Sequence, residues 1–258
     1  MRWVAFILIY LLGRLEGAAA NDYVFPLFVD GATTGMSYRS TLKITNTSTT
    51  NPLQCTLTQR NTSATFTGVD GTFYSADIFD GGFSPPALTQ ITLDRFLPFE
   101  ILRTNSQAPL KTGYAKLSCP ADVQAQLQFS VSDSRNSKVA EASITPATQG
   151  TSFEFLIDKR DGTRLAFSYV NDSAAIGQFA LIARDRFDFE VDRAYDTIDS
   201  WSQVSRFVDE MLRLPSDFVG TIELLGISGG QNYAVGFQFT GIVFATIQPL
   251  VRNAPLSN

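Results

Sequence analysis

The 258-residue sequence contains no histidine and only two cysteines. Without histidine the chain cannot build a Ser-His-Asp or Cys-His nucleophilic system, a His-ligated zinc site or the usual imidazole proton shuttle. Two cysteines cannot hold a structural zinc ion alone, and Cys-x-x-Cys and G-x-x-x-x-G-K-[ST] are both missing. These absences remove the commonest hydrolytic, redox and nucleotide chemistries. We expect no enzyme activity, no metal and no cofactor.

Charge is also scarce, because charged residues make up 17% of the chain and the net charge is −5. A mildly acidic protein has no electrostatic footprint for nucleic acid or for an anionic membrane surface, so neither is expected as a partner. Hydrophobic residues are plentiful at 44%, including 21 phenylalanines. Such a chain can bury a sizeable core, and its length fits two domains of about 120 residues each.

A long hydrophobic run occurs only at the N-terminus. Arg2 precedes the run "WVAFILIYLLG", and three alanines follow it at 18–20. This order is typical of a secretory signal peptide, here residues 1–20, with cleavage after Ala20 or, failing that, Ala19. The run is short for a membrane span, which needs roughly 20 residues, and an uncleaved anchor is the alternative. We therefore expect a secreted, periplasmic or cell-surface protein with no membrane span after signal cleavage.

The two cysteines are Cys55 and Cys119, and both lie in segments that alternate apolar and polar residues. In "LQCTLTQ" and "GYAKLSC" the cysteine shares the apolar face, so both thiols are predicted to point inward. An even count in an oxidising compartment favours a disulfide over two unpaired buried thiols. A bridge closing about 65 residues contributes up to roughly 4 kcal/mol in the loop-entropy model.

Short period-2 segments punctuated by Gly, Pro, Asn and Asp dominate the chain, as in a β-sandwich or barrel. The stretch "PATQGT" at 146–151 is typical of a linker, and the strand pattern restarts after it. We predict an all-β protein with a sandwich domain at 21–146, a second at 151–251 and a C-terminal tail at 252–258.

Four blocks of sequence recur in the same order on the two sides of this linker. They pair FPLFVD (25–30) with FEFLID (153–158), RSTLKITNTS (39–48) with RLAFSYVNDS (164–173), TGYAKLSC (112–119) with VGTIELLG (219–226), and VQAQLQFSV (123–131) with YAVGFQFTG (233–241). An ordered set indicates duplication of one sandwich unit. In the second block Leu42 and Ile44 become Phe167 and Tyr169, so the second core is expected to be more aromatic.

The second block ends each time on Asn-x-Ser, at Asn46 and Asn171, and a third such triplet begins at Asn61. These triplets are glycosylation acceptors only if the source is eukaryotic. The repetition favours another interpretation, in which Asn46 and Asn171 end equivalent strands where the chain turns.

One segment has helical rather than strand-like spacing. In "SWSQVSRFVDEMLRLP" (200–215) apolar residues fall at 204, 207, 208, 211 and 212, and Ser200 with Gln203 forms a candidate capping box. We predict one short helix in the second domain, lying over its core. The alternative is that its apolar stripe binds a partner.

The order of several motifs carries a family resemblance. In the first half they are "FPLFVDG", "ITNTS", "GYAKLS" and "EASITPA", and in the second half "SRFVDEMLRLPSDFVGTIEL" and "GFQFTGIVFATIQPL". The chain resembles the tandem immunoglobulin-like β-sandwich domains of uncharacterised secreted proteins of soil bacteria. The resemblance implies an extracytoplasmic binding or structural module without catalytic residues. The cysteine pair and the stretch 63–83 are not features of that family.

The densest acidic stretch is "RDRFDFEVDRAYD" (184–196). Interpreted as a strand, it places Phe187, Phe189 and Val191 toward the core and Asp188, Glu190 and Asp192 toward solvent. Three interpretations are open for these carboxylates. They form a charge-balanced solvated face with the neighbouring arginines, a weak Ca²⁺ site, or half of a carboxylate pair for glycoside hydrolysis.

Aromatic residues gather in "DGTFYSADIFDGGF" (70–83), namely Phe73, Tyr74, Phe79 and Phe83. They form a candidate ligand loop for a sugar or a protein, or else an edge hairpin whose rings pack on the sandwich. From the whole sequence we expect a non-catalytic exported module for adhesion, surface structure or protein contact. Carbohydrate binding through 70–83 is the alternative, and a carboxylate-dependent hydrolase is a third hypothesis. The expected partner is a protein or an extracellular polysaccharide.

Overall fold

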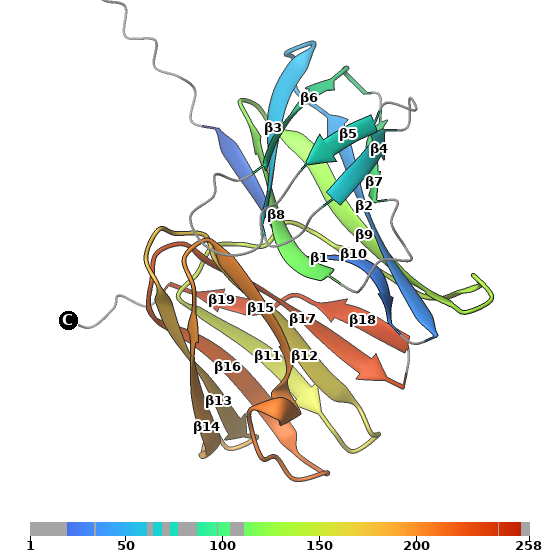
Figure 1. Cartoon of the computed structure of the whole chain (residues 1–258). Coiled ribbons are helices and arrows are strands. Elements are labelled where there is room, and N and C mark those ends of the chain that lie inside the picture. The colour runs from blue at the N-terminus through green and yellow to red at the C-terminus, as the bar shows by residue number, and fades with distance from the viewer. Residues whose placement is uncertain are drawn as a thin grey trace, which may run out of the picture.

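The computed structural model describes residues 20–33, 35–60, 64–68, 73–76, 87–96, 98–103, 111–241 and 243–253. Its fold is all-β, as the alternation predicts, and every sheet is antiparallel (Figure 1). Among the described residues, no helix is long and apolar enough to cross a membrane.

The described residues of the first half form ten strands. They are β1 (Asn21–Thr33), β2 (Met36–Asn46), β3 (Leu53–Arg60), β4 (Ala64–Gly68), β5 (Phe73–Ala76), β6 (Ala87–Leu93), β7 (Pro98–Arg103), β8 (Lys111–Cys119), β9 (Val123–Asp133) and β10 (Lys138–Ile144). One layer contains β1, β8, β3 and β6, and the other contains β5, β4, β7, β2, β9 and β10. Strand β1 pairs with β8 along most of its length and with β2 at its end, so it links the two layers of a sandwich-like fold.

In the part of the second half that the structure describes there are nine strands. They are β11 (Ser152–Asp158), β12 (Arg164–Asn171), β13 (Gly177–Asp185), β14 (Glu190–Ile198), β15 (Ser202–Phe207), β16 (Val219–Ser228), β17 (Asn232–Thr240), β18 (Val243–Ile247) and β19 (Leu250–Arg252). One sheet has the order β14-β13-β16-β11-β19, which we call the outer sheet. The other has the order β15-β12-β17-β18, which we call the inner sheet because it faces the first half (Figure 1).

The same strand pairings recur in both halves. In the first half β1 pairs with β8, β8 with β3, β3 with β6, β7 with β2, β2 with β9 and β9 with β10. In the second half β11 pairs with β16, β16 with β13, β13 with β14, β15 with β12, β12 with β17 and β17 with β18. This shared topology supports the duplication inferred from the four blocks. The hairpin β4–β5 has no counterpart among the described strands of the second half.

Strand register corrects the first alignment of the repeated blocks. Phe25 is opposite Ala115 and Phe155 is opposite Ile222, while the aligned glycines of β8 and β16 make Ala115 equivalent to Ile222. Phe25 therefore corresponds to Phe155 and not to Phe153. A register shift in β1 after Phe25 reduces the offset from two residues to one, because Phe28 is opposite Gly113 and so corresponds to Ile157.

The alignment of the fourth pair of repeated blocks, 123–131 with 233–241, is also offset, by one residue. Leu42 is opposite Leu127 in β9, whereas its equivalent Phe167 is opposite Gly236 in β17, so Leu127 matches Gly236. Gly236 is required at that position because a Cβ atom there would lie 2.7 Å from the ring of Phe155. The ring of Phe155 occupies the space that a side chain at 236 would need.

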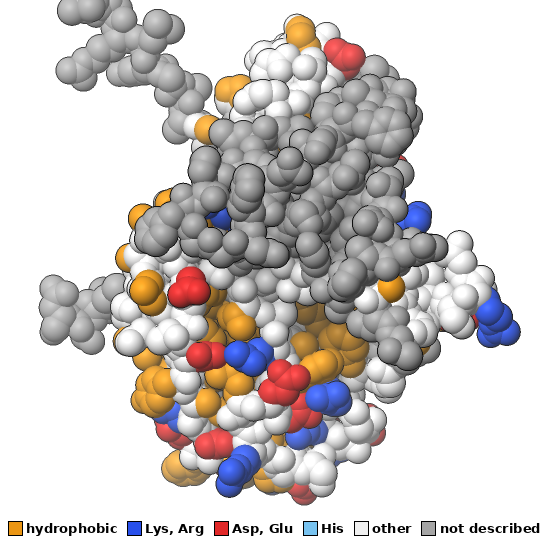
Figure 2. All heavy atoms as spheres, viewed as in Figure 1, with side chains coloured by type: hydrophobic (Ala, Val, Ile, Leu, Met, Phe, Trp, Pro, Cys, Tyr) orange, Lys and Arg blue, Asp and Glu red, His pale blue; other side chains and the backbone are white. Residues whose placement is uncertain are grey.

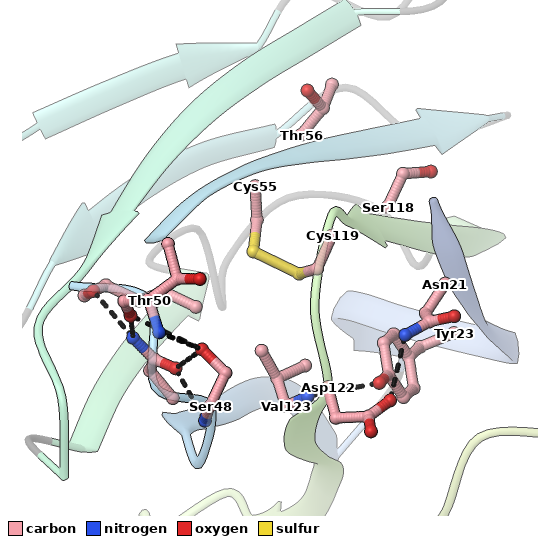
Figure 3. Close-up of a disulfide and its surroundings, with 12 residues drawn as sticks. Asn21, Tyr23, Ser48, Thr50, Cys55, Thr56, Ser118, Cys119, Asp122 and Val123 are labelled. Carbon is pink, nitrogen blue, oxygen red and sulfur yellow. Dashed lines mark hydrogen bonds between the residues drawn. A yellow bond between two sulfur atoms is a disulfide. The ribbon is translucent and has the colours of Figure 1, made fainter. Parts of the chain in front are cut away.

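The disulfide between Cys55 and Cys119 is present and joins the neighbouring strands β3 and β8 (Figure 3). Both cysteines are about 1% exposed or less, and their Cα atoms are 4.5 Å apart, as in a non-hydrogen-bonded antiparallel pair. The bridge therefore closes a 64-residue separation within one sheet. Among the described residues the second core is also more aromatic, as the substitutions at Phe167 and Tyr169 predict, because six of its 16 buried residues are aromatic against five of 24 in the first core.

Asn46 and Asn171 end β2 and β12 and tie the two layers of each half together. The Asn46 amide nitrogen donates to the carbonyl of Thr50 at 2.8 Å and to that of Leu93, at the end of β6, at 3.3 Å. The Asn171 amide nitrogen makes the equivalent bonds to Ala175 at 2.7 Å and to Asp199, just after β14, at 3.1 Å. In each copy the serine two residues later donates its hydroxyl to the asparagine oxygen.

Both asparagines are fully buried, so their amide groups are occupied in the folded protein. We call each a buried asparagine clamp. It explains why the phrase "RSTLKITNTS" recurs as "RLAFSYVNDS", since each sandwich needs the same inter-layer hydrogen bonds at the same corner.

Replacement of a clamp asparagine is expected to destabilise the fold. Asn46→Ala leaves the buried carbonyl of Leu93 without its donor, so the free energy of unfolding should fall by about 1–3 kcal/mol. Thr49→Ala, an exposed position in the same turn, should change it by less than about 0.5 kcal/mol. Denaturant unfolding of both variants tests the clamp, and equal midpoints would contradict it.

The inner sheet is buried on both faces along its two central strands. Leu165, Phe167 and Tyr169 of β12 face the core of the second half, while Val170 contacts Val24 of the first half. The intervening Ser168 is fully buried and donates its hydroxyl to the carbonyl oxygen of Pro26 at 2.7 Å. These contacts replace the usual alternation of buried and exposed residues by near-continuous burial.

Strand β17 and its neighbour β18 complete the core of the first half. Val235, Phe237 and Phe244 belong to the same hydrophobic cluster as the first-half residues. The ring of Phe129 stacks on Phe244 at 4.4 Å and meets Phe237 edge-on at 5.9 Å. The two halves therefore share one apolar interior at their junction.

Polar contacts hold the junction at its margins. Edge strands β10 and β18 lie side by side, with Thr246 donating to the carbonyl of Ser143 at 2.8 Å. The expected linker is also bound on both sides, since Ala147 donates its N–H to Val24 and Gly150 donates to Asn232. These contacts indicate a fixed rather than a hinged junction.

The expected helix at 200–215 is not formed. Ser202–Phe207 make strand β15, and only Val208–Glu210 form a turn of 3₁₀ helix. Ser200 lies in a turn and Gln203 in β15, so these two residues cap no helix and the expected capping box is absent. The apolar residues still reach the core, because Val204 packs against it from the strand while Val208 and Leu212 are buried in the turn that follows.

The junction predicts coupled unfolding of the two halves. Phe237→Ala removes a ring from the first core although it lies in the second half, so it should cost about 3–5 kcal/mol. Amide hydrogen exchange should accelerate in β9 as well as in β17. Val243→Ala, at a 59% exposed position of β18, is the matched control and should change neither. Faster exchange confined to the second half would contradict a shared interior.

Candidate functional site

The predicted aromatic ligand loop lies largely outside the described residues. Phe73 and Tyr74 belong to β5, whose backbone pairs with β4. Phe79 and Phe83 lie outside the described residues. The use of these four rings in ligand binding stays a prediction.

The acidic stretch at 184–196 folds differently from the single strand expected. The Asp185 side chain accepts the backbone N–H groups of Phe187 and Phe189, at 2.8 and 3.0 Å, and Asp188 adopts a left-handed φ of 67°. These bonds form a tight turn between β13 and β14. The prediction that Phe187, Phe189 and Val191 face the core is wrong, because they are 65%, 70% and 43% exposed.

The turn also disperses the three candidate cation ligands. Asp188 lies 3.8 Å from Arg184, Glu190 pairs with Arg193 at 2.5 Å, and Asp192 accepts the backbone N–H of Arg213 at 2.7 Å. Within the described ranges, no group of three or more Asp, Glu, Cys or His side chains is placed to hold a metal ion. The side-chain partners of Asp188 and Glu190 are arginines, in accord with the charge-balanced interpretation.

An open groove runs across the solvent face of the outer sheet. Its lining includes Glu154, Leu156 and Asp158 from β11, Arg184 from β13, Glu223 from β16 and Arg252 from β19. The alternation of β11 sends Phe153 and Phe155 to the core and their neighbours into the groove.

Arginines lie close to two glutamates of this groove. Glu154 pairs with Arg252 at 2.8 Å, and Glu223 lies 3.8 Å from Arg184 while accepting the hydroxyl of Ser152 at 2.8 Å.

The hydrogen bonds from Arg160 lower the pKa of Asp158 to about 2. The Arg193 hydrogen bond likewise lowers the pKa of Glu190. A glycosidase acid needs a raised pKa, so neither of these two carboxyls suits that role.

Exposed aromatic rings lie beside the groove. We call Phe187, Phe189 and Tyr195 the aromatic edge, and Tyr195 is 64% exposed. Arg186 lies over the ring of Phe187 at 4.8 Å, and Arg193 lies over that of Tyr195 at 5.9 Å. Figure 2 shows hydrophobic side chains at the surface along the margin of the second half where Figure 1 places β13 and β14.

A second cluster of polar groups is buried between the halves. Asp172, 3% exposed, accepts the hydroxyl of Tyr114 at 2.7 Å and the ammonium of Lys116 at 2.6 Å. Lys116 also lies 3.9 Å from Asp22.

Nearby rings extend this cluster. Tyr233 packs with Tyr114 in the same small hydrophobic group. The guanidinium group of Arg60, at the end of β3, lies 4.5 Å from the centre of the Trp201 ring. This contact links β3 to the turn before β15.

Sequence reasoning missed this buried cluster, although one signal was present. Asp172 is the middle residue of Asn-Asp-Ser, whose first copy is Asn-Thr-Ser with Thr47 at that place. Thr47 is exposed in the first half, whereas Asp172 is buried against the other half. A charged substitution inside an otherwise repeated phrase was the available clue.

A comparison with known protein families and with curated proteins found no match.

The buried tyrosines predict a loss of stability in alkali. Burial raises the pKa of Tyr233 to about 12 from the ordinary 10.0. Burial also raises the pKa of Tyr114 and Tyr169. The unfolded chain therefore releases these protons first, so stability is kept below pH 10.0 and falls as the pH rises toward 12. Denaturant unfolding on both sides of pH 10.0 should show a shallower decline for Tyr233→Phe; parallel profiles would contradict this.

Proposed function

We propose that the protein is a non-catalytic exported module in which two immunoglobulin-like sandwiches form one rigid body that contacts a protein partner. The observation that carries the proposal is the aromatic edge. Soluble monomers rarely leave several large rings exposed together, and aromatic residues flanked by arginine are enriched in protein–protein contacts.

Several features support a binding role over a catalytic one. The groove is open, and its Glu154 and Glu223 are close to arginines. The described carboxylates provide no metal cluster, and the chain has no histidine. A catalytic carboxylate pair needs different protonation states, which arginine neighbours oppose.

The proposal also includes export of the chain and its resemblance to tandem immunoglobulin-like domains. The disulfide is consistent with an oxidising compartment, where such bonds persist. The antiparallel sheets and their repeated pairing are compatible with tandem immunoglobulin-like domains. In antibody domains the disulfide joins the two sheets, whereas here it joins neighbouring strands of one sheet.

Partner binding should depend on the aromatic edge. The mature protein is immobilised, and retention of cell-surface proteins from the source is compared between wild type and Phe187→Ser/Phe189→Ser. The double variant should lose the retained partner, with a free energy of unfolding within about 0.5 kcal/mol of wild type because both rings are exposed.

The matched control is Phe96→Ser in the first half. Phe96 is 64% exposed, and the preceding Arg95 covers its ring at 4.6 Å, as Arg186 covers Phe187. Equal loss in the control and the double variant would contradict a specific role for the edge. Turnover of a substrate that is abolished by Glu223→Gln would contradict the non-catalytic assignment.

A further inference from the structure

The buried cluster at the junction brings an amine and a carboxyl group into contact. The Lys116 nitrogen lies 2.6 Å from Oδ2 of Asp172, and Tyr114 donates its hydroxyl to Oδ1 of the same carboxyl at 2.7 Å. Tyr114 is fully buried and Asp172 is 3% exposed, so the carboxyl is shielded from solvent. Asp22 is 3.9 Å from the same amine and 40% exposed at its side chain.

We propose that Lys116 and Asp172 form an intramolecular amide bond that joins the two halves covalently. The two residues lie on opposite sides of the junction, on β8 and directly after β12. The site is therefore a self-modification site of the folded chain, separate from the aromatic edge and independent of partner binding.

The reaction needs no oxidant, reductant or outside reactant. A proton moves from the Lys116 ammonium to Oδ2 of Asp172 along their hydrogen bond, which gives a neutral amine and a carboxylic acid. The amine lone pair attacks Cγ of Asp172, and the electron pair of the C=O bond moves to Oδ1. A second proton passes from nitrogen to Oδ2, with Asp22 nearest to relay it. The bond from Cγ to Oδ2 breaks, water leaves and the amide remains.

Each neighbour has a defined part in this step. The Tyr114 hydroxyl faces the oxygen that becomes negative, so it stabilises the tetrahedral intermediate as an oxyanion-hole donor does. Burial raises the pKa of Tyr114, which keeps the hydroxyl protonated and able to donate.

The fixed positions of the two groups also accelerate the reaction. Groups held in contact by a fold react with effective concentrations of about 10⁵ to 10⁸ M. Here the contacts of the fixed junction hold Lys116 against Asp172, and the shielded position slows hydrolysis of the product. The bond would make the junction resistant to separation, as suits a protein exposed outside the cell.

Intact mass spectrometry of the folded, purified mature chain tests the proposal. The wild-type mass should be lower than that of the disulfide-bonded linear chain by one water molecule. Trypsin should fail to cut after Lys116, and tandem spectra should identify one branched peptide that contains Lys116 and Asp172. A wild-type mass equal to the linear chain, with normal cleavage after Lys116, would overturn the proposal.

Two variants separate the bond from an ordinary ion pair. Lys116→Arg keeps the positive charge beside Asp172 but has no reactive amine, so it should show the full linear mass. Tyr114→Phe should lower the cross-linked fraction in a time course after refolding. A fully cross-linked Tyr114→Phe chain would overturn the role given to the hydroxyl. If Lys116→Arg fails to fold, the wild-type mass and its tryptic map decide the question alone.

Discussion

The inner sheet imposes the main constraint on this molecule, because its central strands β12 and β17 must be covered on both faces. One face carries Phe167 and Tyr169 into the core of the second half, and the other carries Val235 and Phe237 into the core of the first. A sheet that is apolar on both faces cannot be left open to water on either side. The second half therefore depends on the first for cover, and the first depends on the second to fill its interior.

This mutual dependence arranges the remaining surfaces. The edges of β10 and β18 are turned toward each other at the junction, which keeps two potential pairing edges away from other chains. The outer sheet is left as the broad face of the second half that points away from the junction. Its groove and aromatic edge lie there, so the three exposed rings of that edge are carried by a scaffold whose two halves share one apolar interior.

Local patterns allowed much of the fold to be predicted from the sequence. Period-2 alternation indicated the strands, and the inward alternation of Cys55 and Cys119 indicated their bridge. The repeated phrase indicated equivalent strand ends at Asn46 and Asn171. The register offset at Phe25 was not accessible, because residues 24–29 are all buried and so show no alternation that would mark the bulge.

Two of the failures have a non-local cause, and the one at 185–189 has a local cause. At 200–215 the helical spacing was real, but pairing of β15 with β12 outweighed it, and the same apolar residues reached the core from a strand and a turn. At 185–189 the backbone bonds to Asp185 reversed the chain and exposed rings assigned to the core. The buried Asp172 could not be located either, because its partners come from the other half of the chain.

The buried asparagine clamps have a practical consequence for production of the protein. Asn46 and Asn171 each stand in an Asn-x-Ser acceptor triplet, yet the folded protein has no space around their amide nitrogens and uses them for inter-layer hydrogen bonds. A host that attaches glycans to nascent chains would modify these residues before the sheets close. Each such glycan would displace a corner of a sandwich, so a secretory eukaryotic host would yield misfolded chains where a bacterial host would not.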